Sequence, residues 1–155
     1  MQDGFVEWPN GGTRKPNALA LGPRAEDLLV PEGYYVLTKR FSAKEERRRV
    51  VAAVYDPTRV VSARVAFENH LNYYHVRGSG LPVTVAKGLA AFLNSTLVDA
   101  YFRQFSGHTQ VNATDLRSLR YPAWGKLVAL GRRIGKSFPA QEELDRLVEE
   151  VMSRG

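Results

Sequence analysis

The feature that most constrains the fold of this chain is a change in the spacing of its apolar residues at residues 78–82 (GSGLP). Before this point, short stretches rich in β-branched and aromatic residues alternate with short connections, at residues 33–41, 47–55, 60–65 and 66–76. The connections are too short for helical crossovers. Residues 33–76 therefore predict a small antiparallel sheet of three to five strands.

After residue 82 the apolar residues recur at intervals of three and four, which is typical of a helix. The pattern predicts one long helix over about residues 83–105, with apolar side chains on two sides, and two more helices at 124–134 and 141–152. The last helix carries an apolar stripe of Leu144, Leu147, Val148 and Val151. The predicted fold class is α+β: a small antiparallel sheet packed on a long helix, followed by a C-terminal helical segment.

Charge and composition narrow the possible partners. The 155 residues carry a net charge of +6 and a pI of about 9.8, a balance that attracts polyanions such as nucleic acid but also occurs in ordinary basic proteins. The absence of cysteine excludes disulfides, thiolate metal sites and cysteine nucleophiles. Without a signal sequence or a run of about 18 apolar residues, we expect no membrane and a cytoplasmic location.

A basic cluster surrounds the first predicted hairpin, with Glu45 and Glu46 as its nearest acidic neighbours. Its members are Lys39, Arg40, Lys44, Arg47, Arg48 and Arg49. If the two strands pair, alternate basic side chains share one face, and phosphate groups would suit that face. The alternative is a solvated hairpin with internal ion pairs, which exposed charges form at little energetic gain.

Two further stretches combine hydrogen-bonding and aromatic side chains. Residues 68–75 (ENHLNYYH) place Asn69, Asn72 and His75 on a predicted strand, and residues 108–112 (HTQVN) add His108 and Gln110. Such side chains can contact bases, but they can also satisfy neighbouring backbone groups. Asn112 fits the start of a short helix, with Asp115 three residues later, so the second stretch favours a structural joint over a DNA contact.

No combination of residues assembles a catalytic or metal site. His70 and His75 with Glu68 do not match a known ligand spacing, and the chain has no nucleophile elbow or phosphate-binding glycine loop. Two alternatives to DNA binding stay open. One is a protein-interaction module that docks a partner subunit through its C-terminal helices, and the other is a stand-alone enzyme such as a nuclease.

Three stretches together resemble a known family: residues 35–57 (YVLTKRFSAKEERRRVVAAVYDP), 67–75 (FENHLNYYH) and 88–122 (GLAAFLNSTLVDAYFRQFSGHTQVNATDLRSLRYP). They are similar to the C-terminal part of adenine-specific DNA methyltransferases of type II restriction-modification systems. That part resembles the TaqI-like specificity domain, which selects the DNA target.

The resemblance implies a division of the chain into an irregular segment at 1–31, at the edge of a longer protein, a target-recognition domain at 32–122, and packed C-terminal helices at 123–155. It implies double-stranded DNA and the catalytic domain of the same polypeptide as partners. The family's S-adenosylmethionine loop and Asn-Pro-Pro-Tyr motif are not in this sequence. We therefore expect no cofactor in this chain and no methyl transfer by it alone.

Overall fold

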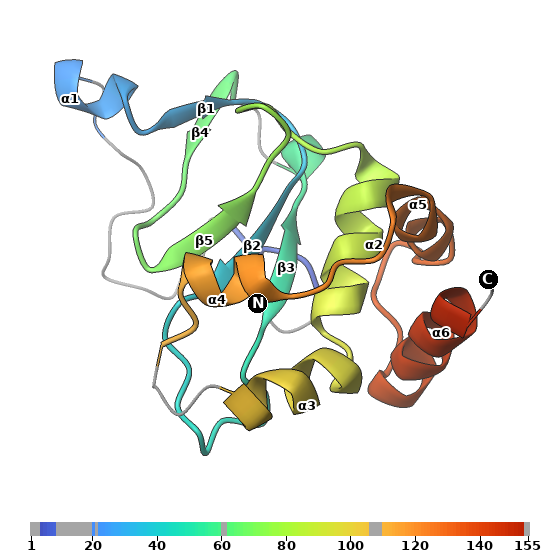
Figure 1. Ribbon diagram of the computed structural model, residues 1–155. Helices are drawn as coiled ribbons and strands as arrows, with labels where there is room; N and C mark the ends of the chain where they lie inside the picture. The colour runs from blue at the N-terminus through green and yellow to red at the C-terminus, as the bar shows by residue number, and fades with distance from the viewer. Residues whose placement is uncertain (1–3, 9–19, 21, 60–61, 106–109, 154–155) are drawn as a thin grey trace.

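The computed structural model describes residues 4–8, 20, 22–59, 62–105 and 110–153. In chain order its elements are α1 (Pro23–Glu26), β1 (Leu29–Pro31), β2 (Tyr35–Lys39), β3 (Ala52–Tyr55), η1 (Pro57–Arg59), β4 (Arg64–Ala66), β5 (Leu71–Tyr74), α2 (Val83–Leu93), α3 (Thr96–Phe105), α4 (Ala113–Ser118), α5 (Trp124–Arg132) and α6 (Gln141–Ser153). Figure 1 shows the strands on one side of α2, with α5 and α6 on the other. The predicted α+β fold is confirmed.

The main sheet has three antiparallel strands in the order β3–β2–β5, so β2 lies at its centre. Val36 pairs with Val54 and Tyr74, and these residues face the main hydrophobic core. That core also contains α2, α3 and α4. Because β2 has neighbours on both edges and cover on both faces, its residues 35–38 are buried.

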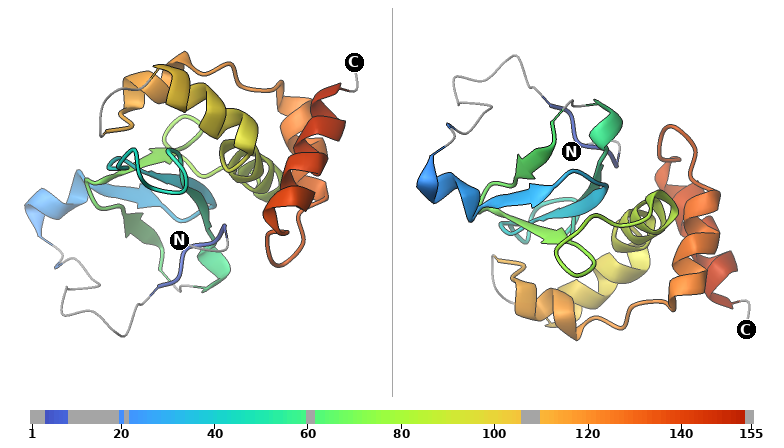
Figure 2. Two further views of the ribbon diagram at one scale, coloured as in Figure 1. Left: turned by 90° about the horizontal axis from the view of Figure 1, so that it is seen from below. Right: turned by 90° about the horizontal axis from the view of Figure 1, so that it is seen from above.

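The opposite face of the main sheet carries Tyr35, Leu37 and Tyr55, which form a second, smaller core. A two-stranded ribbon of β1 and β4 covers this face, contributing Val30 and Val65. The view from below in Figure 2 shows β4 on one side of the sheet and α3 and α4 on the other. The sheet is therefore enclosed between a helical layer and a short ribbon.

The outer edge of β3 is closed by two other segments. The Asn94 side chain accepts a hydrogen bond from the Ala52 N–H at 2.9 Å and donates one to the Ala52 carbonyl at 2.8 Å. The Val54 N–H donates to the Gly4 carbonyl at 2.7 Å, and the Val54 carbonyl accepts from the Val6 N–H at 2.9 Å. Ala52 and Val54 are the β3 residues whose backbone groups point away from β2, so their edge is satisfied.

α2 is the central helix, and it crosses α5 at very short range. A Cβ atom on Gly88 would lie 2.0 Å from the Leu127 carbonyl oxygen, and one on Gly131 would lie 1.7 Å from the Thr84 carbonyl oxygen. Only glycine permits this backbone contact. α6 then packs its stripe of Leu144, Leu147, Val148 and Val151 into the same core.

Several sequence predictions are confirmed and others are wrong in detail. The two C-terminal helices and the capping box of Asn112 and Asp115 are present. The predicted long helix is two helices, because Asn94 and Ser95 interrupt it: Asn94 binds β3, and the Ser95 hydroxyl accepts from the Val98 N–H.

The strand predictions differ at three places. The strands predicted at 60–65 and 66–76 are the shorter β4 and β5, with a turn between them. The strand predicted from residue 47 begins at Ala52, so the basic residues before it lie in a connection and not on a strand face. β1, which ends in Pro31 at an exposed position, was not predicted from the sequence. Proline is tolerated at a sheet edge and at a strand terminus, which explains how it can end this strand.

Candidate nucleic-acid interface

Three segments meet beyond the C-terminal end of β2. They are the β2–β3 connection (residues 40–51), the β4–β5 turn (67–70) and residues 110–111 ahead of α4. Arg40 joins all three: its N–H donates to the His70 carbonyl at 2.9 Å, and its carbonyl accepts from the Val111 N–H at 2.7 Å. Its guanidinium donates to the Asn69 carbonyl at 2.7 Å. The three segments therefore form one connected surface.

Neighbouring residues reinforce this junction. Phe41 forms a backbone bridge with Gln110, and the rings of Phe41 and His70 lie 5.2 Å apart, edge to face. The Asn72 amide donates to the Val111 carbonyl at 3.2 Å. The His70 ring is in turn hydrogen-bonded to the Glu68 carboxylate. The polar residues of the junction thus hold its backbone in place while several of their side chains stay exposed.

The β2–β3 connection is held against α3 by a charged pair. Arg103 donates to the carbonyls of Lys44 at 3.0 Å, Glu46 at 2.9 Å and Arg47 at 3.1 Å. Asp99 accepts from the Arg103 Nε at 2.8 Å and from the Arg49 N–H at 2.6 Å. The long connection is therefore an ordered structure built on a helix, as the course of residues 40–51 beside α3 in Figure 1 shows.

The cations of this connection differ in accessibility. Lys44 and Arg47 are exposed, whereas Arg49 is only 1% exposed and donates to the Ser42 carbonyl at 2.6 Å. Arg48 is half-buried and donates to the Asn94 carbonyl. Burial lowers the pKa of the Arg48 guanidinium, which the carboxylates of Asp145 and Asp99 oppose. Of the three consecutive arginines, Arg47 is therefore the most exposed to solvent.

The remaining predicted contact residues do not all lie at the junction. Asn69 and Gln110 are exposed at the junction, and Lys39 pairs with Glu46 at 3.4 Å, as the ion-pair alternative anticipated. His75 lies elsewhere, because β5 runs antiparallel to β2 and places Tyr74 opposite Val36, at the other end of the sheet. The predicted contact at His108 lies outside the described residues.

Of the predicted residues, Arg40, Asn69 and Gln110 meet at this junction, together with Phe41 and His70, which were not predicted as contacts, and Lys44 and Arg47 lie on the connection that leaves it. We call the surface that they form the loop surface; its members are Arg40, Phe41, Lys44, Arg47, Asn69, His70 and Gln110. Arg103 and Asp99, which support it, were also missed. Their spacing of four residues on a helix is visible in the sequence, but their contact with a loop more than fifty residues away is not.

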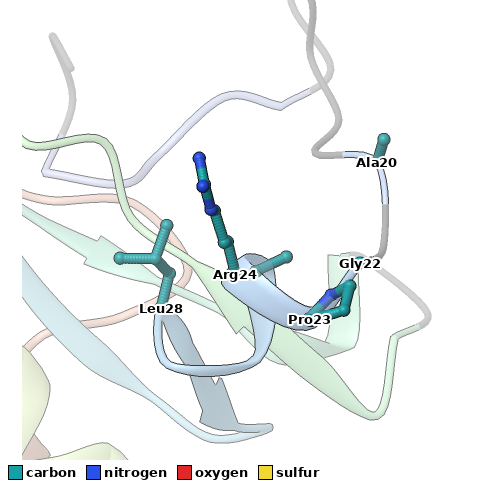
Figure 3. Close-up of a pocket in the computed structure, with 6 residues that line it drawn as sticks. Ala20, Gly22, Pro23, Arg24 and Leu28 are labelled. Atoms are coloured by element: carbon teal, nitrogen blue, oxygen red, sulfur yellow. The ribbon is translucent and has the colours of Figure 1, made fainter.

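Among the described residues, the depression around α1 offers no catalytic side chain. Figure 3 shows a shallow depression around α1, lined by Ala20, Gly22, Pro23, Arg24, Ala25 and Leu28, none of which is a general acid, base or nucleophile. Among the described residues, no group of three His, Asp or Glu side chains could hold a metal ion. No helix in the described part of the chain is long and apolar enough to cross a membrane.

Comparison with known proteins shows that the chain is similar to one part of two longer enzymes, both type II methyltransferases. The chain is 46% identical over 152 residues to the type II methyltransferase M.PstI of Providencia stuartii, covering 98% of this chain and 30% of that protein. It is 48% identical over 141 residues to the type II methyltransferase M.BsuBI of Bacillus subtilis, covering 90% of this chain and 28% of that protein. No protein-family model and no solved structure matches.

These relatives confirm the resemblance to type II methyltransferases and extend it. The similarity expected for residues 35–122 covers nearly the whole chain in the first relative, including its C-terminal helices. The chain nevertheless spans less than a third of the length of either relative.

Proposed function

We propose that this chain is the DNA target-recognition part of an adenine-specific methyltransferase of a type II restriction-modification system. A catalytic domain of the same polypeptide would bind S-adenosylmethionine and transfer the methyl group. The observation that carries the proposal is the loop surface, on which exposed cations and amides share one supported framework, in a chain homologous to part of two type II methyltransferases.

The loop surface offers two kinds of contact. Lys44 and Arg47 are exposed cations on an anchored connection, which suits them to DNA phosphates. Phosphate contacts fix the position of a protein on duplex DNA, whereas contacts to base edges select the sequence. Asn69 and Gln110 carry amides that can pair with an adenine edge. Together they would hold the target so that an adenine can leave the stack, at a cost of a few kcal/mol.

The interaction-module alternative loses its main support in this structure. It required the stripe on α6 to be exposed, yet Leu144, Leu147, Val148 and Val151 are between 2% and 8% exposed. They are covered by the chain's own core. We therefore do not propose that α6 docks a partner through this stripe.

The phosphate contacts can be tested by titrating the chain against a fluorescently labelled random duplex at several salt concentrations. We expect Lys44→Gln with Arg47→Gln to lower the slope of log affinity against log salt by about two, and the affinity at about 0.1 M salt by about 10- to 100-fold. Arg132→Gln with Lys136→Gln, which removes two exposed charges near the end of α5, is the matched control. Absence of binding at low salt, or equal losses in both double variants, would contradict the proposal.

Base selection needs a separate measurement. Selection from a pool of random duplexes should enrich one sequence with the unaltered chain. Asn69→Ala with Gln110→Ala should reduce that enrichment while leaving the salt dependence unchanged, because neither residue carries a charge. Enrichment of the same sequence to the same extent would exclude these amides from base selection.

A further inference from the structure

Phe41 is an exposed aromatic residue in the middle of the loop surface. It is 45% exposed, although an aromatic side chain of this size is normally placed inside a protein. Its ring lies 5.2 Å from the His70 ring at an angle of 64°, so the two rings form an edge-to-face pair. His70 is also exposed. The pair therefore presents aromatic surface to solvent.

The position of Phe41 is fixed by its backbone neighbours. Arg40, immediately before it, is bonded to His70 and Val111 through its own N–H and carbonyl, and Phe41 itself bridges to Gln110. Ser42, immediately after it, is buried. Its hydroxyl donates to the Arg48 carbonyl, and its carbonyl accepts from the Arg49 guanidinium. Phe41 thus projects from a supported turn, and little conformational entropy remains to be lost when it binds a ligand.

The surroundings of Phe41 distinguish it from the other exposed apolar residues. Arg40 precedes it and is hydrogen-bonded to the Asn69 carbonyl, Lys44 and Arg47 follow on the same connection, and Gln110 lies opposite it in a backbone bridge. Trp124, which is 51% exposed, lies on α5 across α2 from the sheet. Aromatic rings within a positively charged surface are how proteins bind unpaired bases, because every base has a face on which a ring can stack.

We propose that Phe41 and His70 form a stacking site for an unpaired base in a distorted DNA duplex. This inference rests on the proposed function, since a base that leaves its pair is what adenine methylation requires. The site would bind the exposed face of the base, while Lys44 and Arg47 hold the adjoining phosphates. Stacking does not depend on the DNA sequence. It would therefore act in addition to the phosphate contacts that position the target and the base contacts that select it.

The test compares two labelled duplexes of the same sequence, one fully paired and one with a single unpaired 2-aminopurine. We expect the unaltered chain to bind the second about tenfold more tightly and to quench its fluorescence, since stacking on an aromatic side chain contributes an effect of this order. Phe41→Leu should abolish the preference and the quenching, with affinity for the paired duplex within about twofold of the unaltered chain's. His70→Ala should reduce both signals, and Trp124→Leu, the matched control, should reduce neither.

The possible outcomes separate the two proposals. Salt-sensitive binding without preference for the unpaired base would overturn the stacking site and leave the proposed function standing. A preference that survives Phe41→Leu would also overturn it. Failure to bind either duplex at low salt would overturn both proposals.

Discussion

Arg103 shows how one side chain can order a long connection. Its guanidinium donates to three carbonyls of the β2–β3 connection, and Asp99 orients it from one helical turn earlier. Arginine suits this role because its donors are arranged in a rigid plane, whereas the ammonium of lysine is a compact charge. The connection needs such a support, because it joins two strands through about a dozen residues without regular structure.

We expect Arg103→Lys to loosen the connection while keeping the charge. Because the Arg103 side chain is 39% exposed, the loss of unfolding free energy should be modest, about 1 kcal/mol. Cleavage by trypsin after Lys44 and Arg47 should become several-fold faster, since a protease requires its substrate segment to open. Mass spectrometry of timed digests would measure the two cleavage rates, and the rate of cleavage at Arg132 is the internal control. Unchanged cleavage at Lys44 and Arg47 would show that Arg103 does not order the connection.

The three consecutive arginines mark the limit of sequence prediction at this scale. Arg47, Arg48 and Arg49 are identical in type and adjacent, yet they are exposed, half-buried and buried. The difference comes from their partners. Arg48 donates to the Asn94 carbonyl, and Arg49 donates to Asp99 and to the Ser42 carbonyl. The Asn112–Asp115 capping box was predictable because all its partners lie within four residues.

At the scale of elements, the least predictable feature is the start of α3. Apolar residues recur at helical spacing on both sides of Asn94 and Ser95, so the spacing by itself does not predict a break. The break arises because Asn94 turns to bind β3 and Asp145 of α6 binds the first turn of α3. The Asp145 carboxylate accepts from the Thr96 N–H at 2.7 Å and from the Thr96 hydroxyl at 2.6 Å.

This cap should make stability depend on pH. Burial raises the pKa of the Asp145 carboxyl, but hydrogen bonds from Thr96 and Gln141 and the charge of Arg48 outweigh it, so the pKa is lowered. A lowered pKa stabilises the fold above the unfolded-state value of about 3.9, and this contribution is lost as the pH falls through the folded-state value.

We expect Asp145→Ala to lose about 1 kcal/mol of unfolding free energy at pH 7, and the difference from the unaltered chain to shrink below about pH 4. Urea unfolding at several pH values would measure it. Asp145→Asn, which retains one acceptor oxygen, should lose less. A difference that stays constant down to about pH 2 would exclude the carboxylate as the titrating group.

The contact between α2 and α5 depends on two glycines that no sequence pattern marked. We expect Gly88→Ala to cost about 3 kcal/mol or more, because the added Cβ would meet the Leu127 carbonyl at 2.0 Å and backbone cannot yield as a side chain can. Gly125→Ala on α5 is the matched control: its Cβ would meet nothing within 4 Å, so it should change stability by less than about 1 kcal/mol. Chemical denaturation would measure the free energy of unfolding of both variants. Equal losses in the two variants would contradict the close contact between α2 and α5.

At the scale of the whole molecule, one core spans the chain from Phe5 to Val151. The general arrangement of sheet, helix and C-terminal helices could be predicted because each has its own periodicity. The sharing of one core could not, because it depends on which faces meet. α5 and α6 contribute six fully packed residues to it: Leu127, Leu130, Leu144, Leu147, Val148 and Val151.

We therefore expect a chain that ends at Pro122 to lose cooperative unfolding, because α2 would expose the apolar face that α5 covers. The full chain should unfold in one transition when followed by near- and far-ultraviolet circular dichroism. The shortened chain should show helical signal without that transition. A sharp transition in the shortened chain would instead identify the C-terminal helices as a separable unit.

The closed edge of β3 has a consequence for how copies of this protein behave toward one another. A strand with unpaired backbone groups is a template on which another chain can add its own strand, the first step toward aggregation. Here Asn94 occupies the outward groups of Ala52, and Gly4 and Val6 occupy those of Val54. Recruitment of a second molecule at this edge would first require the start of the chain and the end of α2 to be displaced.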